Sequence, residues 1–148
     1  MKKMIKTYLL IVVACLPLSM LAQKKDTLKL TCPLNEAIEP PAEKQPYSLG
    51  VAELKIVLKS PTDTTVKACI DGTITTIMKD DDGTWMIMFN HKDYYFLYSG
   101  ITRTSAMKGQ RVQTGDMIGY LKPGDKIEFQ LYDFETPLDP KKYMTCVK

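Results

Sequence analysis

The chain has 148 residues with 20 basic and 17 acidic side chains, one histidine and a formal net charge of +3. Three of the basic residues, Lys2, Lys3 and Lys6, lie within the first six positions, so the rest of the chain carries 17 charges of each sign. A neutral surface argues against nucleic acid as a partner and gives no support to electrostatic membrane binding. The length fits one domain with a core of its own.

Residues 1–22 have the pattern of a secretory signal peptide, with a basic start, an apolar run from Tyr8 to Leu21 and the small residue Ala22. The run is too short for a stable membrane span, which needs about 20 apolar residues. We therefore expect export to the periplasm or the extracellular space, with no transmembrane segment after signal removal. The alternative is a lipoprotein, because Val12-Val13-Ala14-Cys15 resembles a lipobox, but the apolar residues after Cys15 argue against it.

Residues 23–49 contain four prolines among mixed charges and show no regular period, which predicts an irregular N-terminal arm. Cys32 lies in this arm and Cys146 in the short C-terminal tail, residues 145–148. An oxidising compartment would allow a disulfide between them if the two ends of the domain meet, although connectivity is not readable from sequence. Cys69 stands in an apolar run and is expected to be a buried small hydrophobe.

Residues 50–144 consist of short runs rich in β-branched and aromatic residues, separated by turn residues. This texture predicts a single, mostly β domain with an antiparallel sheet, and no segment has a helical period. The expected strands are Glu53–Leu58, Thr65–Ile70, Gly72–Met78, Trp85–Asn90, Tyr94–Ser99, Met117–Leu121 and Lys126–Tyr132.

Two turns follow from residue type. Asp80–Gly83 ends in Asp-Gly between two strand-like runs, which indicates a hairpin rather than a calcium loop, because the ligand spacing of an EF-hand is absent. Lys122–Asp125 contains Pro-Gly and precedes the last expected strand. Alternation along that strand predicts one face formed by Ile127, Phe129 and Leu131 and an opposite face formed by Lys126, Glu128, Gln130 and Tyr132.

Several segments, in this order, resemble the LytM/lysostaphin zinc endopeptidases. Val66–Ile74 is similar to the family's "V-x-A-x-x-D-G-x-V", Met86–His91 to "V-x-I-x-H", Tyr94–Ile101 to the segment ending "Y-A-H-L", Gly109–Gly119 to "G-Q-x-V-x-x-G-Q-x-I-G" and Asp139–Tyr143 to "D-P-x-x-Y". The resemblance implies a β-sheet and barrel-sandwich hybrid fold of the duplicated hybrid motif type. The order of the segments makes it more specific than any single segment.

The resemblance also implies where the family's zinc ligands and catalytic histidine would stand. The positions fall on Glu53, Val57, Lys126, Glu128 and Gly100, none of which is a histidine. The single histidine, His91, stands where the family has a histidine that is not a ligand. We therefore expect no catalytic residues, no metal site and no cofactor. Glu53 and Glu128 would sit near Lys126, so a salt bridge in place of a metal is expected.

These observations predict an exported, catalytically inactive LytM-like domain whose groove binds peptidoglycan stem peptide or an envelope protein and regulates cell-wall hydrolysis. The candidate groove residues are Glu53, His91, Tyr98, Lys126, Glu128, Gln130 and Tyr132. The simpler interpretation is that they are solvent-side residues of a sheet, which alternate polar in any case. The alternative function is a peptidoglycan hydrolase with an altered active site, for which Glu53 and Glu128 are the only acid pair that we can place.

Overall fold

The computed structural model describes residues 27–41 and 54–146 of the chain. The predicted signal peptide, Cys15 and Glu53 lie outside these ranges. The described part is almost entirely β-structure: β1 (Lys55–Lys59), β2 (Thr65–Lys67), β3 (Gly72–Lys79), β4 (Trp85–His91), β5 (Tyr94–Ile101), β6 (Arg111–Val112), β7 (Met117–Tyr120), β8 (Lys126–Asp133), β9 (Thr136–Leu138) and one 3₁₀ turn, η1 (Pro140–Lys142). Among these residues no helix is long and apolar enough to cross a membrane.

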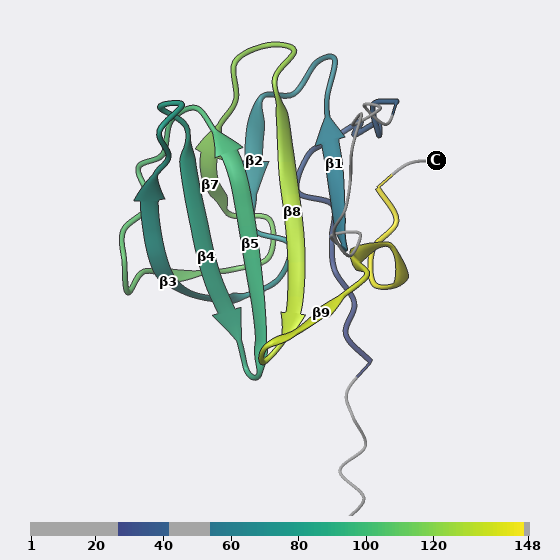
Figure 1. The fold of residues 1–148 in the computed structure, drawn as a ribbon, viewed down its shortest axis with the longest axis vertical. Coiled ribbons are helices and arrows are strands. Elements are labelled where there is room, and N and C mark those ends of the chain that lie inside the picture. Colours follow the sequence, from purple (N-terminus) through teal and green to yellow (C-terminus); the bar gives the residue numbers. More distant parts are fainter. Residues whose placement is uncertain (1–26, 42–53, 147–148) are drawn as a thin grey trace, which may run out of the picture.

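All strand pairs are antiparallel, and they form two sheets (Figure 1). The larger sheet has the order β1-β8-β5-β4-β3-β6, and β9 continues along the edge of β8 beyond β1. The smaller sheet contains β2 and β7 and lies behind the larger one in the view of Figure 1. The prediction of a mostly β, antiparallel single domain is confirmed.

The core lies between the two sheets, and strict alternation along β8 shows why. Ile127, Phe129 and Leu131 are fully buried, whereas Glu128 and Gln130 between them are half-buried. Because successive strand residues point to opposite faces, one face of β8 packs inward and the other stays outside. The face of the larger sheet opposite the core is called the outer face below.

The N-terminal arm is part of this core. Leu30, Leu34 and Ala37 are buried, and the backbone of Ile38 pairs with that of Lys59 beside β1. The arm has no regular strand, but its apolar side chains belong to the same buried cluster as those of the two sheets. A disulfide joins Cys32 of the arm to the C-terminal end.

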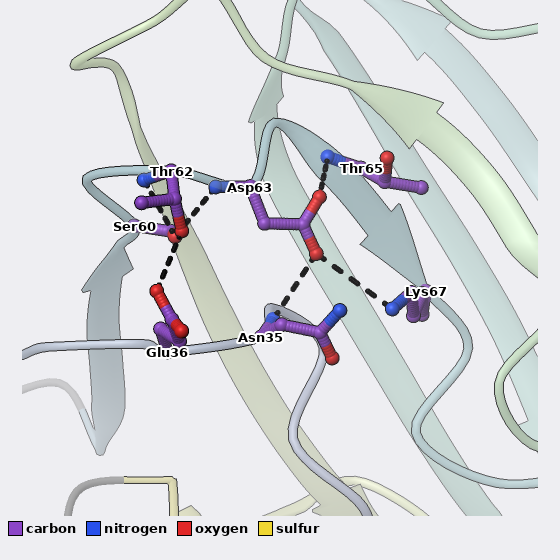
Figure 2. A network of polar contacts seen from close by, with 7 residues as sticks. All are labelled: Asn35, Glu36, Ser60, Thr62, Asp63, Thr65 and Lys67. Atoms are coloured by element: carbon purple, nitrogen blue, oxygen red, sulfur yellow. Dashed lines mark hydrogen bonds and ion pairs between the residues drawn. The ribbon is translucent and has the colours of Figure 1, made fainter.

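A polar network fixes the arm against the loop between β1 and β2 (Figure 2). The Asp63 carboxylate accepts hydrogen bonds from the backbone N–H groups of Thr65 (2.8 Å) and Asn35 (3.4 Å), and the Lys67 ammonium lies 3.6 Å away. Burial raises the pKa of Asp63, but these hydrogen bonds and the positive charge outweigh it, so the pKa is lowered. The buried Ser60 hydroxyl accepts from the Asp63 N–H and completes the turn.

The expected strands correspond to observed ones, with small differences in length. The strand expected over Thr65–Ile70 ends at Lys67, because the register shifts there and the chain turns toward Gly72. The short strands β6 and β9 were not expected, since two or three residues carry no readable alternation. The Asp-Gly hairpin is confirmed: Gly83 has φ +85° and its N–H donates to the carbonyl of Asp80.

Candidate functional site

The register brings together two of the positions at which the resemblance placed the zinc ligands, Val57 and Glu128, whereas Glu53 lies outside the described residues. Val57 on β1 is the direct cross-strand partner of Glu128 on β8, and Glu128 in turn faces Ser99 on β5. Partners in an antiparallel pair project to the same side of the sheet. Three adjacent strands therefore present Val57, Glu128 and Ser99 together on the outer face.

Glu128 forms an ion pair with Lys55, which lies two residues before Val57 on the same face of β1. The Lys55 ammonium lies 2.9 Å from a Glu128 carboxylate oxygen, and both side chains are about one third exposed (27% and 36%). The sequence suggested Lys126 as the cation near Glu128, whereas Lys55 supplies the ion pair observed here. Solvent screens a pair that is this exposed, so it contributes little to stability.

Gly100 occupies the position of the family's further catalytic histidine, and its backbone leaves no room for a side chain. It has φ +89°, and an added Cβ would lie 2.8 Å from the carbonyl oxygen of Lys126. A residue with a side chain would be strained by the positive φ and would also collide with β8. The difference from the family is therefore built into the backbone.

These residues do not fit a zinc ion. Val57 offers no donor atom, Glu128 is engaged by a lysine, and the ammonium of Lys126 has no lone pair to donate when charged. Across residues 27–41 and 54–146, no group of three or more His, Cys, Asp or Glu side chains is arranged to hold a metal ion.

The outer face around the ion pair is partly apolar. Gln130 faces Leu97, which faces Met88 on β4, and all three are half-buried. Tyr132, two residues after Gln130, is the next residue of β8 on this face, and it pairs with Tyr95. The Tyr132 hydroxyl donates a hydrogen bond to the Gln130 side-chain oxygen at 2.6 Å. A sheet face that only meets solvent is expected to be polar at alternate positions. Here β8 meets that expectation, but β4 and β5 do not.

Tyr98 does not belong to this face, and its assignment to the groove was wrong. Its side chain is fully buried, and its hydroxyl oxygen accepts a hydrogen bond from the backbone N–H of Cys69 at 3.0 Å. Burial raises the pKa of Tyr98 well above its ordinary value and raises the pKa of the Cys69 thiol to about 12. Alternation with Phe96 already placed Tyr98 on the inner face of β5.

His91 is separated from the ion pair of Lys55 and Glu128. It pairs with Tyr94 at one end of β5, whereas Glu128 pairs with Ser99 near the other end. His91 lines an open pocket of about 410 Å³ at the ends of β3, β4 and β6. The pocket is lined by Asp71, Gly72, Thr73, Asn90, His91, Lys92, Arg111, Val112 and Gln113. Sequence reasoning did not find this pocket, because it joins three segments that lie far apart in the chain.

Known structures share this fold. The chain superposes on Csd3 of Helicobacter pylori with a TM-score of 0.62 and 17% identity over 80% of its own length and 33% of Csd3. A chain of the SpoIIQ–SpoIIIAH pore-forming complex gives 0.59 and 17% over 82% of this chain and 94% of that one. Lysostaphin gives 0.52 and 21% over 64% and 45%, respectively.

These identities are low enough that the superpositions establish the fold alone. The chain spans only a third of the length of Csd3 and less than half of lysostaphin. No curated protein sequence matches the chain closely enough to count as a relative. The sequence signature of Peptidase family M23, however, matches residues 54–140, which is 87 of the 148 residues. The expected resemblance is confirmed, and the chain belongs to peptidase family M23.

Proposed function

We propose that this chain is an exported M23-fold domain that binds an extended peptide on the outer face of its larger sheet and does not cleave it. The observation that carries the proposal is the ion pair between Lys55 and Glu128, which stands beside Val57 where the family's zinc ligands would be. Zinc peptidases activate water on a metal held by three protein ligands. The residues present here supply no such set, so the family's hydrolytic chemistry is not supported.

The composition of the outer face supports a binding role over a purely solvent-facing one. Leu97 and Met88 form an apolar centre, and Tyr95 and Tyr132 lie beside them with polar neighbours on β8. Apolar patches with a polar rim are typical of interaction sites. An extended peptide would combine contacts to the apolar centre with hydrogen bonds to Gln130 and the neighbouring side chains.

Two sources can supply such a peptide: the stem peptide of peptidoglycan or a segment of an envelope protein. A chain that matches this one over 82% of its length is part of the SpoIIQ–SpoIIIAH complex, which supports a protein partner. In either case the bound domain would regulate cell-wall hydrolysis by occupying a peptide or a protein that an active hydrolase needs.

Export is supported by two independent features. The N-terminal sequence has the pattern of a secretory signal, and a disulfide connects Cys32 with Cys146. Disulfides persist in oxidising compartments such as the periplasm and the extracellular space. The lipid-anchored form through Cys15 is the second route by which the protein would reach the envelope.

Cosedimentation with purified sacculi tests whether the bound peptide is the peptidoglycan stem peptide. The exported protein should sediment with intact sacculi and lose binding to sacculi from which an amidase has removed the stem peptides. The L97K variant should bind at least about tenfold less, because it places a charge in the apolar centre. Met107 lies in a loop and is 68% exposed, so M107K adds the same charge elsewhere and should bind as the wild type does.

The two alternatives, a protein partner and a hydrolase, would give different results. A protein partner would show as an envelope protein that copurifies with the wild type and M107K but not with L97K, without binding to sacculi. Release of soluble muropeptides in the presence of added zinc, together with stoichiometric zinc by plasma mass spectrometry, would overturn the proposal in favour of a hydrolase. Equal binding by L97K and wild type would remove the outer face as the binding surface.

A further inference from the structure

The pocket at the ends of β3, β4 and β6 carries polar side chains that the proposed function does not use. It is an open hollow of about 410 Å³. It lies at the opposite end of the sheet from Glu128, because His91 pairs with Tyr94 and Glu128 with Ser99. A ligand bound here would not contact the ion pair on the outer face.

The imidazole of His91 is held in a defined orientation. Its Nδ1 lies 2.7 Å from the backbone carbonyl oxygen of Asp71, and the Asp71 carboxylate lies 3.6 Å from the same nitrogen. Because a carbonyl oxygen only accepts, Nδ1 must carry the hydrogen and donate it. Nε2 of the ring remains for another partner, as an acceptor when the ring is neutral and as a donor when it is charged.

Arg111 brings an uncommitted cation to the same pocket. It is exposed, and its guanidinium has no hydrogen-bond or ion-pair partner among residues 27–41 and 54–146. Its backbone pairs with Thr73, which pairs with Asn90, so the three side chains start from one row across β6, β3 and β4. The side-chain amides of Asn90 and Gln113 likewise make no hydrogen bond within the described part of the chain.

The guanidinium of Arg111 selects the class of ligand. It has no counter-charge among the described residues, whereas the Asp71 carboxylate lies 3.6 Å from His91, so an anion is the group that Arg111 can bind here. The planar guanidinium matches a carboxylate through two parallel hydrogen bonds. Amide groups such as those of Asn90 and Gln113 suit the peptide group that precedes a C-terminal carboxylate.

We infer that this pocket binds the free C-terminal carboxylate of a short peptide, with Arg111 as the residue that recognises the carboxylate. Asn90 and Gln113 bond the adjoining peptide group, and the fixed His91 ring borders the site. The inference goes beyond the proposed function by adding a defined contact at one end of the outer face. Asn90 is the cross-strand partner of Tyr95, so the pocket adjoins the surface proposed for the extended peptide, and the R111Q and L97K variants test the two surfaces separately.

Titration of the exported, isotope-labelled protein with N-acetyl-alanyl-alanine, followed by amide NMR, tests this inference. Saturable shifts should appear for the amides of residues 71–73, 90–92 and 111–113. The same peptide with an amidated C-terminus should bind at least about tenfold more weakly, because a charge-assisted pair of hydrogen bonds is lost.

Variants at the two arginines separate recognition from general charge effects. R111Q should lose at least about tenfold in affinity for the free acid. The affinity of R111K should lie between those of R111Q and the wild type, because lysine keeps the charge but cannot form the two parallel hydrogen bonds of a guanidinium. R103Q removes the same charge at a residue whose guanidinium lies 5.1 Å from the Tyr120 ring, away from the pocket, and should bind normally. An unchanged spectrum of free R111Q outside the pocket shows that it is folded.

Three results would overturn the inference. The first is an absence of saturable binding by the free acid, and the second is equal binding of the acid and its amide. The third is equal loss of affinity in R111Q and R103Q.

Discussion

Loss of the disulfide should strongly destabilise the domain, because the bond closes almost the whole described chain into one loop. Cys32 and Cys146 are 114 positions apart. In the chain-entropy description, a crosslink that closes a loop of this length lowers the entropy of the unfolded chain by about 16 cal/mol/K, which corresponds to about 5 kcal/mol at 25 °C. Measured effects are commonly 2–4 kcal/mol, so we expect a loss of about 3–5 kcal/mol.

The perturbation is the double variant C32S/C146S, compared with the oxidised wild type by urea unfolding and thermal unfolding. We expect the free energy of unfolding to fall by the amount above and the melting temperature to fall on the order of 10 °C. The slope of free energy against urea should increase, since the unfolded chain without the crosslink exposes more surface. Cys69 is buried and remains in both proteins, so any effect of this free thiol on stability is the same in the two measurements.

A reducing agent provides the second control. It should lower the stability of the wild type to that of C32S/C146S and leave the variant unchanged. A loss below about 1 kcal/mol, or an equal response of both proteins to reduction, would refute the reasoning. A small loss would mean that packing of Leu30, Leu34 and Ala37 holds the arm in place without the bond. An equal response would mean that reduction acts elsewhere than on this disulfide.

Three further predictions concern single residues. Y98F should lower the free energy of unfolding by about 1–3 kcal/mol by leaving the buried N–H of Cys69 without an acceptor, as chemical denaturation would show, and a neutral result would contradict that bond. Because the pKa of Asp63 is lowered in the folded state, its stabilisation is present above the unfolded pKa of about 4 and is lost as the pH falls through the folded value. D63N should therefore be less stable than the wild type at pH 7 and should lose less stability on acidification. Equal profiles of unfolding free energy against pH for the two proteins would contradict this prediction. G100H should lower the melting temperature more than G83A, because both positions have positive φ but only Gly100 meets the neighbouring backbone, and it should not gain stoichiometric zinc by mass spectrometry.

Local patterns in the sequence determined the strands and their two faces. Alternation is a relation between residues i and i+2, so it is visible without knowing the fold, and Ile127, Phe129 and Leu131 are buried as it predicts. The Asp-Gly turn is also local, because it depends on the freedom of one glycine. The single histidine is a matter of composition and already separates this chain from the ligand pattern that the family resemblance implies.

Long-range pairing decided the sites. The partner of Glu128 is Lys55, 73 positions away, and it is set by the register between β1 and β8 rather than by any local spacing. Similarly, His91 and Arg111 line the same pocket only because β3 pairs with β4 on one side and with β6 on the other. Sequence alone fixes which side of a strand a residue takes, but which strands become neighbours depends on the burial of the whole chain, and that places each side chain in a core, a groove or a pocket.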